Sequence, residues 1–448
     1  MKLKMTKKQI ILGSIVLLLV FVFIFSWVKW ISPTKIAFLN YQPIELGQIA
    51  KANTNGFIKI KELSTDDIDD VGDYDMVFIN GMGLRITEEQ RTIIRKAAEN
   101  GTPVLTTMAT NPDNNICSVD SLMVNDLKEY LSGGRANYRN LLEYVRTYID
   151  CKAMFTNEPE EPVESQSYLL SHPDVDDPDA EEIGFNTLRE YKTYLKSRNL
   201  IADNAPNIII TGQMGEPSEL IAALEKSGNN VYRVWNMRKF INDGHADSIS
   251  VAAVINMAHG RMGDYMVEYL SENNVPLFCP VNANQLQEDW EADKMGMNGG
   301  FLSQSVVTPE IDGGIRPYAL FAHYENDEGI REVKAIPGRL DTFVETVNNH
   351  ISLKRTPNKD KKIAIVYYKG PGVSAMSAAG MDVGPSLYNL LLRLGKEGYY
   401  LKNLPSSPAE LEKMVQADRR ILFGNVAIVP QPLPNQGENS FKIIHGTD

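Results

Sequence analysis

The 448-residue sequence has little cysteine and lacks the short motifs that mark the commonest catalytic sites. Its three cysteines, Cys117, Cys151 and Cys279, include no CxxC pair, which disfavours a zinc ribbon. Their odd number argues against a disulfide scaffold, although a single bridge stays open. There is no HExxH, no GxxxxGK followed by Ser or Thr, no clean GxGxxG and no GxSxG. We therefore expect neither a zinc protease nor an α/β-hydrolase nucleophile, and no nucleotide bound by this chain.

The chain also lacks an excess of positive charge, because 57 Asp and Glu outnumber 45 Lys and Arg and the formal net charge is −12 at pH 7. A chain of this sign suits nucleic acid poorly, so we expect no nucleic-acid partner. Hydrophobic residues make up 43% of the chain, which is enough for sizeable cores. The length leaves room for about two to four domains of ordinary size.

One long hydrophobic run is present, from Ile10 to Val28. As a helix it would extend about 28 Å, close to the hydrocarbon thickness of a bilayer. Lysines precede it, and Trp27 and Trp30 stand at its far end, where an interfacial aromatic belt belongs. A cleaved signal peptide is the alternative, but no A-x-A-like site follows. The pattern predicts a cytoplasmic N-terminus (1–9), a single inner-membrane anchor (10–31) and an extracytoplasmic, periplasmic body.

After the anchor, strand-like and helical runs alternate. Thr87 and Gln90 fit a capping box at the start of the first helical run. The alternation predicts an α/β fold of several doubly wound, Rossmann- or flavodoxin-like parallel sheets, the first spanning residues 35–111. Its runs are Lys35–Tyr41, Asp73–Gly81 and Pro103–Ala109 as strands and Thr87–Gly101 as the helix.

The rest of the chain is divided by composition. Residues 112–200 look helical, then acidic and proline-rich, and we expect a connecting region there. A second α/β unit is expected at 201–353 and a third at 361–448. The glycine-rich loop Lys369–Gly384 could present N–H groups to an anion, but tight packing is the commoner role of small residues.

Candidate site residues come from strand ends and one loop. His259 and His445 each follow a strand-like run and precede glycine, and such strand ends face the ligand side of open α/β sheets. Glu310, Asp312 and Arg316 lie in the stretch VVTPEIDGGIRPYALFAHYE, from Val306 to Glu325. Two apolar, strand-like runs flank a turn signal there, so we expect a hairpin or a loop at a sheet edge.

Four stretches together resemble a known family. They are NVPLFCPVNANQLQEDWEADKMGMNGGFLSQSVVTPEIDGGIRP, KKIAIVYYKGPGVSAMSAAGMDVGPSLYNLLLRLGKEGYYLKNLP, GNVAIVPQP and IIHGTD. Their order and spacing are similar to those of the cobaltochelatase large subunit (CobN type) and the magnesium chelatase H subunit, from about Asn207 onward. Residues 1–110 fit only loosely. The pattern breaks off at Asp448, so we expect a fragment or one part of a split protein.

The resemblance implies a protein that binds a tetrapyrrole as substrate and inserts or removes a divalent metal, Fe or Co. Family insertases work in the cytoplasm with AAA+ partners, whereas a body outside the membrane has no ATP supply. We therefore expect a membrane-anchored relative acting on haem or a cobalt corrin precursor, with haem dechelation as one candidate activity. His445 would be the catalytic proton or metal partner. Glu310, Asp312, His259 and Arg316 would contact the substrate, with Arg316 pairing a propionate.

Two other classes stay open. A non-catalytic module would hold tetrapyrrole, or would support other chelatase subunits or a downstream polypeptide. A cytoplasmic insertase would need the first helix to have the inverted orientation.

Overall fold

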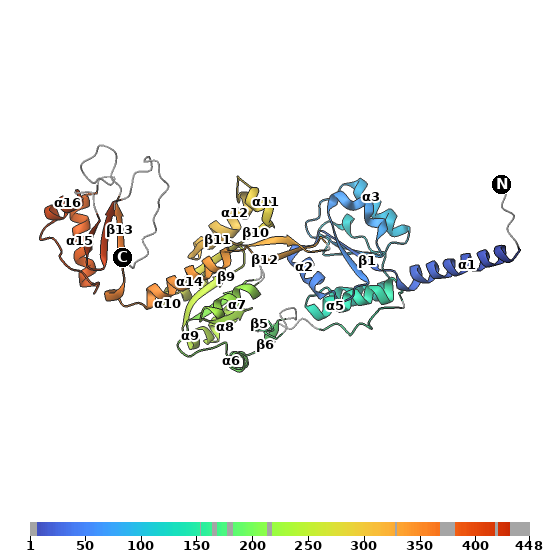
Figure 1. Ribbon diagram of the computed structural model, residues 1–448, viewed down its shortest axis with the longest axis horizontal. Coiled ribbons are helices and arrows are strands. Elements are labelled where there is room, and N and C mark those ends of the chain that lie inside the picture. Colours follow the sequence, from blue (N-terminus) through green and yellow to red (C-terminus); the bar gives the residue numbers. More distant parts are fainter. Residues whose placement is uncertain are drawn as a thin grey trace. The chain divides into compact units, whose positions relative to one another are not determined.

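A computed structural model of the chain contains two compact units, Met1–Val347 and Asn348–Asp448 (Figure 1). Within the described residues, the first unit holds two β-sheets and the second unit holds one. The structure describes residues 7–152, 154–163, 168–176, 182–212, 217–327, 329–367, 381–416 and 420–430.

The first sheet has four parallel strands in the order β2-β1-β3-β4. Helices cover both of its faces, so the central strands are apolar along most of their length. Phe38 of β1 stacks on Phe78 of β3, with 5.2 Å between ring centroids. The strands are β1 (Thr34–Leu39), β2 (Ile58–Leu63), β3 (Met76–Asn80) and β4 (Val104–Thr107), and the helices are α2 (Pro43–Ala52), η2 (Thr65–Asp73), α3 (Glu88–Glu99), α4 (Ser121–Tyr130) and α5 (Arg135–Tyr144).

The start of α3 confirms the predicted capping box. Thr87 Oγ1 accepts a hydrogen bond from the Gln90 N–H at 3.2 Å, and Gln90 Oε1 accepts one from the Thr87 N–H at 2.9 Å. The pair satisfies two of the backbone donors that the end of a helix leaves open. Gln90 Nε2 also donates to the Thr65 carbonyl at 2.8 Å, which joins α3 to η2.

The second sheet has eight strands in the order β12-β11-β10-β9-β7-β8-β5-β6. The five strands from β11 to β8 are parallel, while β12 at one edge and β5 and β6 at the other pair in antiparallel fashion. The prediction of helix-flanked parallel sheets is confirmed. The strands are β5 (Leu170–His172), β6 (Ile183–Phe185), β7 (Asn207–Thr211), β8 (Asn230–Val234), β9 (Val251–Asn256), β10 (Leu277–Leu286), β11 (Gly314–Glu325) and β12 (Arg331–Ala335), and the longer helices are α6 (Leu188–Ser197), α7 (Ser218–Lys226), α10 (Asp264–Asn273) and α14 (Arg339–Arg355).

The stretch from Val306 to Glu325 corrects one expectation. Its first part is helical instead of strand-like, because η5 (Ser303–Val307) runs directly into α13 (Thr308–Ile311). Pro309 is the second residue of α13, and the φ that its ring fixes is compatible with helical backbone. The stretch therefore joins a helix to β11, and the expected pair of strands across the Asp-Gly-Gly turn is wrong.

The two sheets of the first unit contact each other through β12. Arg331 at the start of β12 forms an ion pair with Glu62 of β2. Ile330 is buried in the apolar core of the first sheet. Gly47 of α2 packs so closely that an added Cβ would lie 3.1 Å from the Arg331 carbonyl oxygen. A larger residue at this helical position would have to shift α2 or β12 by a few tenths of an ångström.

The second unit has a sheet of three strands in the order β13-β15-β14. β13 pairs with β15 in parallel, and β14 forms an antiparallel hairpin with β15. Most of the glycine-rich loop after β13 lies outside the described residues, so its anion-binding interpretation stays a prediction. The elements are β13 (Ile363–Tyr367), α15 (Val383–Lys396), α16 (Pro408–Gln416), β14 (Ile421–Phe423) and β15 (Val426–Pro430).

The N-terminal apolar run forms α1 (Lys7–Ser26), which continues into the π-helical turn η1 (Trp27–Ile31). Among the described residues, one helix is long and apolar enough to cross a membrane, with its span at Ser14–Ile31. No residue of that span is buried against the rest of the protein.

Candidate functional site

The second sheet reverses its strand order between β7 and β9. The next strand after β7, β8, lies on one side of it, whereas β9 and then β10 lie on the other. In open parallel sheets, ligands bind outside the carboxyl ends of the strands at such a point. The residues that follow β7 and β9 are therefore the natural candidate site. We call Gly212, Asn256, Ala258 and His259 the switch-point edge.

Backbone contact between the two strand ends shapes this edge. Gly212 has a φ of +87°, and a Cβ there would lie 2.4 Å from the Ala258 nitrogen. The Ala258 N–H donates to Asn256 Oδ1 at 3.0 Å, and Asn256 is almost fully buried. The chain can approach this closely only because residue 212 has no side chain.

His259 is half-buried at the switch-point edge and is held from one side. Its Nδ1 lies 3.0 Å from Ser305 Oγ of η5, and the Phe301 ring contacts it edge-on at 5.6 Å. Burial lowers the pKa of His259, so the imidazole is neutral at pH 7. This contact joins Nδ1 to the Ser305 hydroxyl in either ring tautomer, and Nε2 makes no hydrogen bond to a described residue.

Asp312 lies near this edge but is fully engaged. Its Oδ1 accepts from Arg261 Nε at 2.7 Å, and its Oδ2 accepts from the backbone N–H groups of Met262 at 2.5 Å and Gly263 at 3.4 Å. The side chain is 1% exposed, and the contact raises the pKa of Arg261. Asp312 therefore binds, from another part of the chain, the backbone just before α10, and it fixes the loop that carries His259.

The other predicted residues lie apart from His259. Glu310 is exposed on α13, and Arg316 is exposed near the start of β11, two strands away from β9. The Arg316 guanidinium lies 4.9 Å from the Tyr318 ring centroid, and the Arg339 guanidinium lies 3.9 Å from the same ring. His445 lies outside the described residues. Of the four predicted residues that the structure describes, it thus brings only His259 and Asp312 into one neighbourhood, through the loop at Arg261.

Sequence reasoning missed the residues at the neighbouring strand end. Arg233 of β8 donates to the Gly212 carbonyl at 2.8 Å and stacks on Trp235, 5.0 Å from its ring centroid. Trp235 is 43% exposed, and its Nε1–H donates to Ser171 Oγ at 2.7 Å. The sequence YRVWNM holds the only signal, a charged and an aromatic residue at the end of an apolar run.

Two further observations bear on ligands. Within the described residues, no group of three His, Cys, Asp or Glu side chains could hold a metal ion. The helical stretch that holds Ser305 also exposes three apolar side chains, Leu302, Val307 and Ile311. A recess of about 390 Å³ lies at the opposite, amino end of β7 and β8, where Leu200 and Asn229 line it, far from His259.

A model of the CobN/Magnesium Chelatase family matches residues 128–422, which is more than half of the chain. The chain therefore belongs to the CobN/magnesium chelatase family, and the resemblance inferred from its sequence is confirmed.

Individual relatives agree with this membership. The magnesium-chelatase H subunit of Chlorobaculum parvum is 27% identical over 265 residues, which cover 53% of this chain and 20% of that protein. Uncharacterized protein MJ1441 of Methanocaldococcus jannaschii is 28% identical over 234 residues, 49% of this chain and 18% of that protein. The chain thus spans about a fifth of the length of these relatives.

A solved structure extends the likeness to the fold. The catalytic subunit of cobaltochelatase from Mycobacterium tuberculosis superimposes with a TM-score of 0.60 at 15% identity. The superposition covers 90% of this chain and 39% of that one. The chain therefore has a cobaltochelatase-like fold.

Proposed function

We propose that this chain is a membrane-anchored chelatase subunit that binds a tetrapyrrole, haem or a cobalt corrin precursor, at the switch-point edge. Family membership supports the substrate class, since relatives are magnesium chelatase and cobaltochelatase subunits. The observation that carries the proposal is His259, a neutral imidazole fixed through Nδ1 with Nε2 open. Exposed Trp235 and Leu302 offer apolar surface to a flat macrocycle.

The proposed reaction inserts or removes the substrate metal, with haem dechelation as the form that needs no nucleotide. Removal of a metal returns protons to the pyrrole nitrogens, and insertion takes them away. His259 Nε2 could bind the metal or exchange such a proton, and the lowered pKa keeps the ring neutral and its lone pair available for either role. His445 keeps the same assignment on the strength of the resemblance.

An absorbance titration of the full chain with haem and with metal-free porphyrin tests the binding. We expect a Soret shift that His259→Ala weakens and that His245→Ala leaves unchanged. His245 is a matched control because it is also half-buried but begins α9 (His245–Ile249), which leads into the amino end of β9. Absence of a Soret shift with either pigment would refute the proposal, and equal loss in both variants would remove His259 from the site.

A holding module without chemistry is the second candidate. The partner of His259 Nδ1 is a serine hydroxyl, which raises the basicity of the ring less than a carboxylate does. Incubation with haem under reducing conditions separates the two functions. Fluorescent metal-free porphyrin would form only if the chain removes the metal, whereas a stable Soret band without new fluorescence would indicate a holder.

The proposed orientation places the N-terminus inside and the body outside the inner membrane. Cys117 and Cys151 are exposed, while Cys279 is buried, so native thiols serve as probes. We expect a membrane-impermeant maleimide to label spheroplasts, and the Cys117→Ser/Cys151→Ser chain to stay unlabelled. Labelling that appears only after lysis would show a cytoplasmic body and would favour an insertase with ATP-dependent partners.

A further inference from the structure

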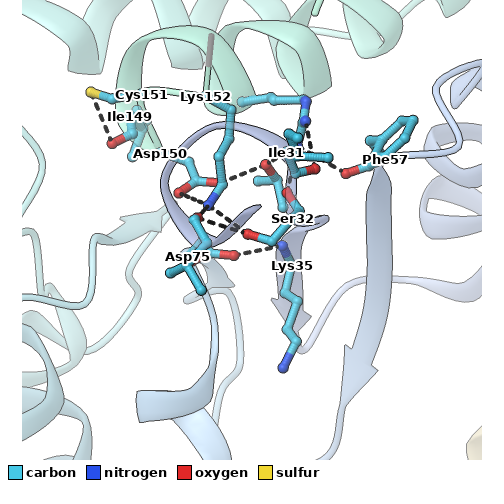
Figure 2. Close-up of polar contacts among 12 residues, drawn as sticks. Ile31, Ser32, Lys35, Phe57, Asp75, Ile149, Asp150, Cys151 and Lys152 are labelled. Carbon is cyan, nitrogen blue, oxygen red and sulfur yellow. Dashed lines mark hydrogen bonds and ion pairs between the residues drawn. The ribbon is translucent and has the colours of Figure 1, made fainter. Parts of the chain in front are cut away.

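The end of the apolar helix is joined to the body by hydrogen bonds as well as by the chain. Lys152 Nζ donates to the Val28 carbonyl at 2.8 Å and to Ser32 Oγ at 2.9 Å. Two residues on, the Met154 N–H donates to the Trp30 carbonyl at 3.2 Å. Figure 2 shows Lys152 and Asp150 reaching toward Ser32 at this junction. The segment after α5 is therefore fixed beside the last turn of the helix.

One buried arginine holds both sides of the junction. Arg146 has no exposed surface, and burial lowers its pKa. Its guanidinium donates to carbonyl oxygens of the helix end and of the loop that follows, so neither can move without breaking buried hydrogen bonds. The acceptors are the carbonyl oxygens of Ile31, Ser32, Phe57, Met154 and Phe155 and the hydroxyl of Thr34.

The same loop turns two large apolar side chains outward. Met154 is 43% exposed and Phe155 is 53% exposed. Phe155 has a φ of +56°, a conformation that aromatic residues rarely adopt. Its ring stacks on Phe57 at 4.4 Å, and its carbonyl accepts from Asn55 Nδ2 at 2.9 Å. The contacts with Phe57 and Asn55 therefore hold Phe155 in an uncommon backbone conformation, in which the side chains of Met154 and Phe155 stay exposed.

The charges around Met154 and Phe155, and the position of these residues along the apolar helix, indicate what this surface contacts. In the segment CKAMFTN, from Cys151 to Asn157, the only charged residue is Lys152, whose ammonium is directed at the helix end. Acidic residues begin at Glu158, where the chain already runs back along α5: Asn157 bonds Glu143, and the Val163 N–H bonds Asn137. The apolar pair is thus confined to the level of Trp30.

We propose that Met154 and Phe155 insert into the headgroup and acyl boundary of the same bilayer, forming with Trp27 and Trp30 an interfacial collar. This inference rests on the proposed membrane anchoring by α1. Trp27 and Trp30 are 42% and 39% exposed at the helix end, where interfacial aromatics belong. The collar lies on the β2 side of the first sheet, through Phe57. The acidic turn at Asp69–Asp73 lies on the β3 side, so the body is expected to tilt toward the collar.

Site-specific fluorescence in the full chain tests the collar. Starting from Cys117→Ser/Cys151→Ser, an environment-sensitive dye is attached at Met154→Cys, Met82→Cys or Leu18→Cys, and the protein is placed in lipid nanodiscs. Met82 is the matched control, since it is 56% exposed and follows the carboxyl end of β3, away from the helix. We expect a blue-shifted emission that spin-labelled lipid quenches for Met154→Cys, and neither effect for Met82→Cys.

The Leu18→Cys probe, in the middle of α1, separates failure of the collar from failure of the anchor. If lipid quenches the dye at position 18, but the dye at position 154 shows neither a blue shift nor quenching, the collar is overturned and the anchor stands. Absence of quenching at both positions would overturn both. A blue shift at position 154 without lipid quenching would indicate a protein partner there and would also overturn the collar.

Discussion

In the first unit, polar side chains gather at the amino ends of the strands of the first sheet and at the carboxyl ends of the strands of the second sheet. The two groups differ in how completely their hydrogen bonds are made. At the amino ends of the strands in the first sheet, Arg146 and Lys152 are buried and Asp150 is partly buried. Arg146 and Asp150 both bond the Thr34 hydroxyl, and Lys152 bonds the Ser32 hydroxyl. At the carboxyl edge of the second sheet, His259 is half-buried and leaves Nε2 open. Both edges collect polar side chains where strands end. We call the first group the closed edge, because its polar atoms bond to other parts of the chain and hold them together. We call the second group the open edge, because His259 Nε2 is available to a ligand.

Replacement of Arg146 by alanine should lower the free energy of unfolding more than any other change considered, because it removes the donor that the closed edge shares. Several buried carbonyl oxygens would lose their donor, and the free energy of unfolding should fall by about 3–5 kcal/mol. Urea unfolding of the full chain measures this. Arg198→Ala is the control, since its ion pair with Asp176 is 38% exposed on the arginine side and such pairs contribute about 0–1 kcal/mol. Equal effects of the two variants would contradict the closed-edge description.

Gly212→Ala introduces a steric clash at the switch-point edge, next to His259. The new Cβ meets the Ala258 nitrogen and must also adopt a positive φ, so stability should fall by about 2–5 kcal/mol and Soret binding should weaken. Gly228→Ala is matched in φ, at +89°, but has no atom within 4 Å of its Cβ. That variant should lose about 1–2 kcal/mol from backbone strain alone and should bind normally. Equal losses would show that the close approach does not matter.

Asp312→Asn sharpens the description of the loop that carries His259. Both carboxylate oxygens accept hydrogen bonds, so the new amide NH₂ must face a donor, at a cost of about 1–3 kcal/mol. Thermal unfolding measures the loss. Asp264→Asn removes the other, exposed carboxylate on Arg261 and should change stability by less than about 1 kcal/mol. A larger effect of Asp264→Asn would contradict the role of Asp312 in fixing this loop.

The smallest effect concerns pH. The folded pKa of His259 lies below its usual value of 6.5, so the unfolded chain binds more protons as the pH falls below 6.5. The contribution of His259 to stability is therefore complete above that pH and declines as the pH falls from 6.5 toward the folded pKa. Buried His323 has a pKa lowered in the same direction, by burial and then by Arg331. Midpoints of thermal unfolding should fall with acidification, and less steeply in His259→Gln.

Local patterns allowed correct prediction where neighbours in sequence are neighbours in space. The capping box at Thr87 and Gln90 and the apolar parallel strands belong to this kind. Residues 306–311 were mispredicted because β-branched Val306 and Val307 favour a strand, whereas in the fold this stretch is helical and Ser305, just before it, contacts His259. Arg146 meets carbonyl groups about a hundred positions away, and no local pattern encodes those contacts.

The guanidinium shared between the helix end and the loop also limits motion. A junction made only of a covalent linker lets a soluble domain rotate freely above a bilayer. Here the carbonyl groups of Ile31 and Met154 accept from the same nitrogen, so α1 and the first sheet must turn as one body. With α1 in a bilayer, as proposed, rotational diffusion of that sheet should match the slow rotation of its helix, and the sheet should keep a constant height above the lipid.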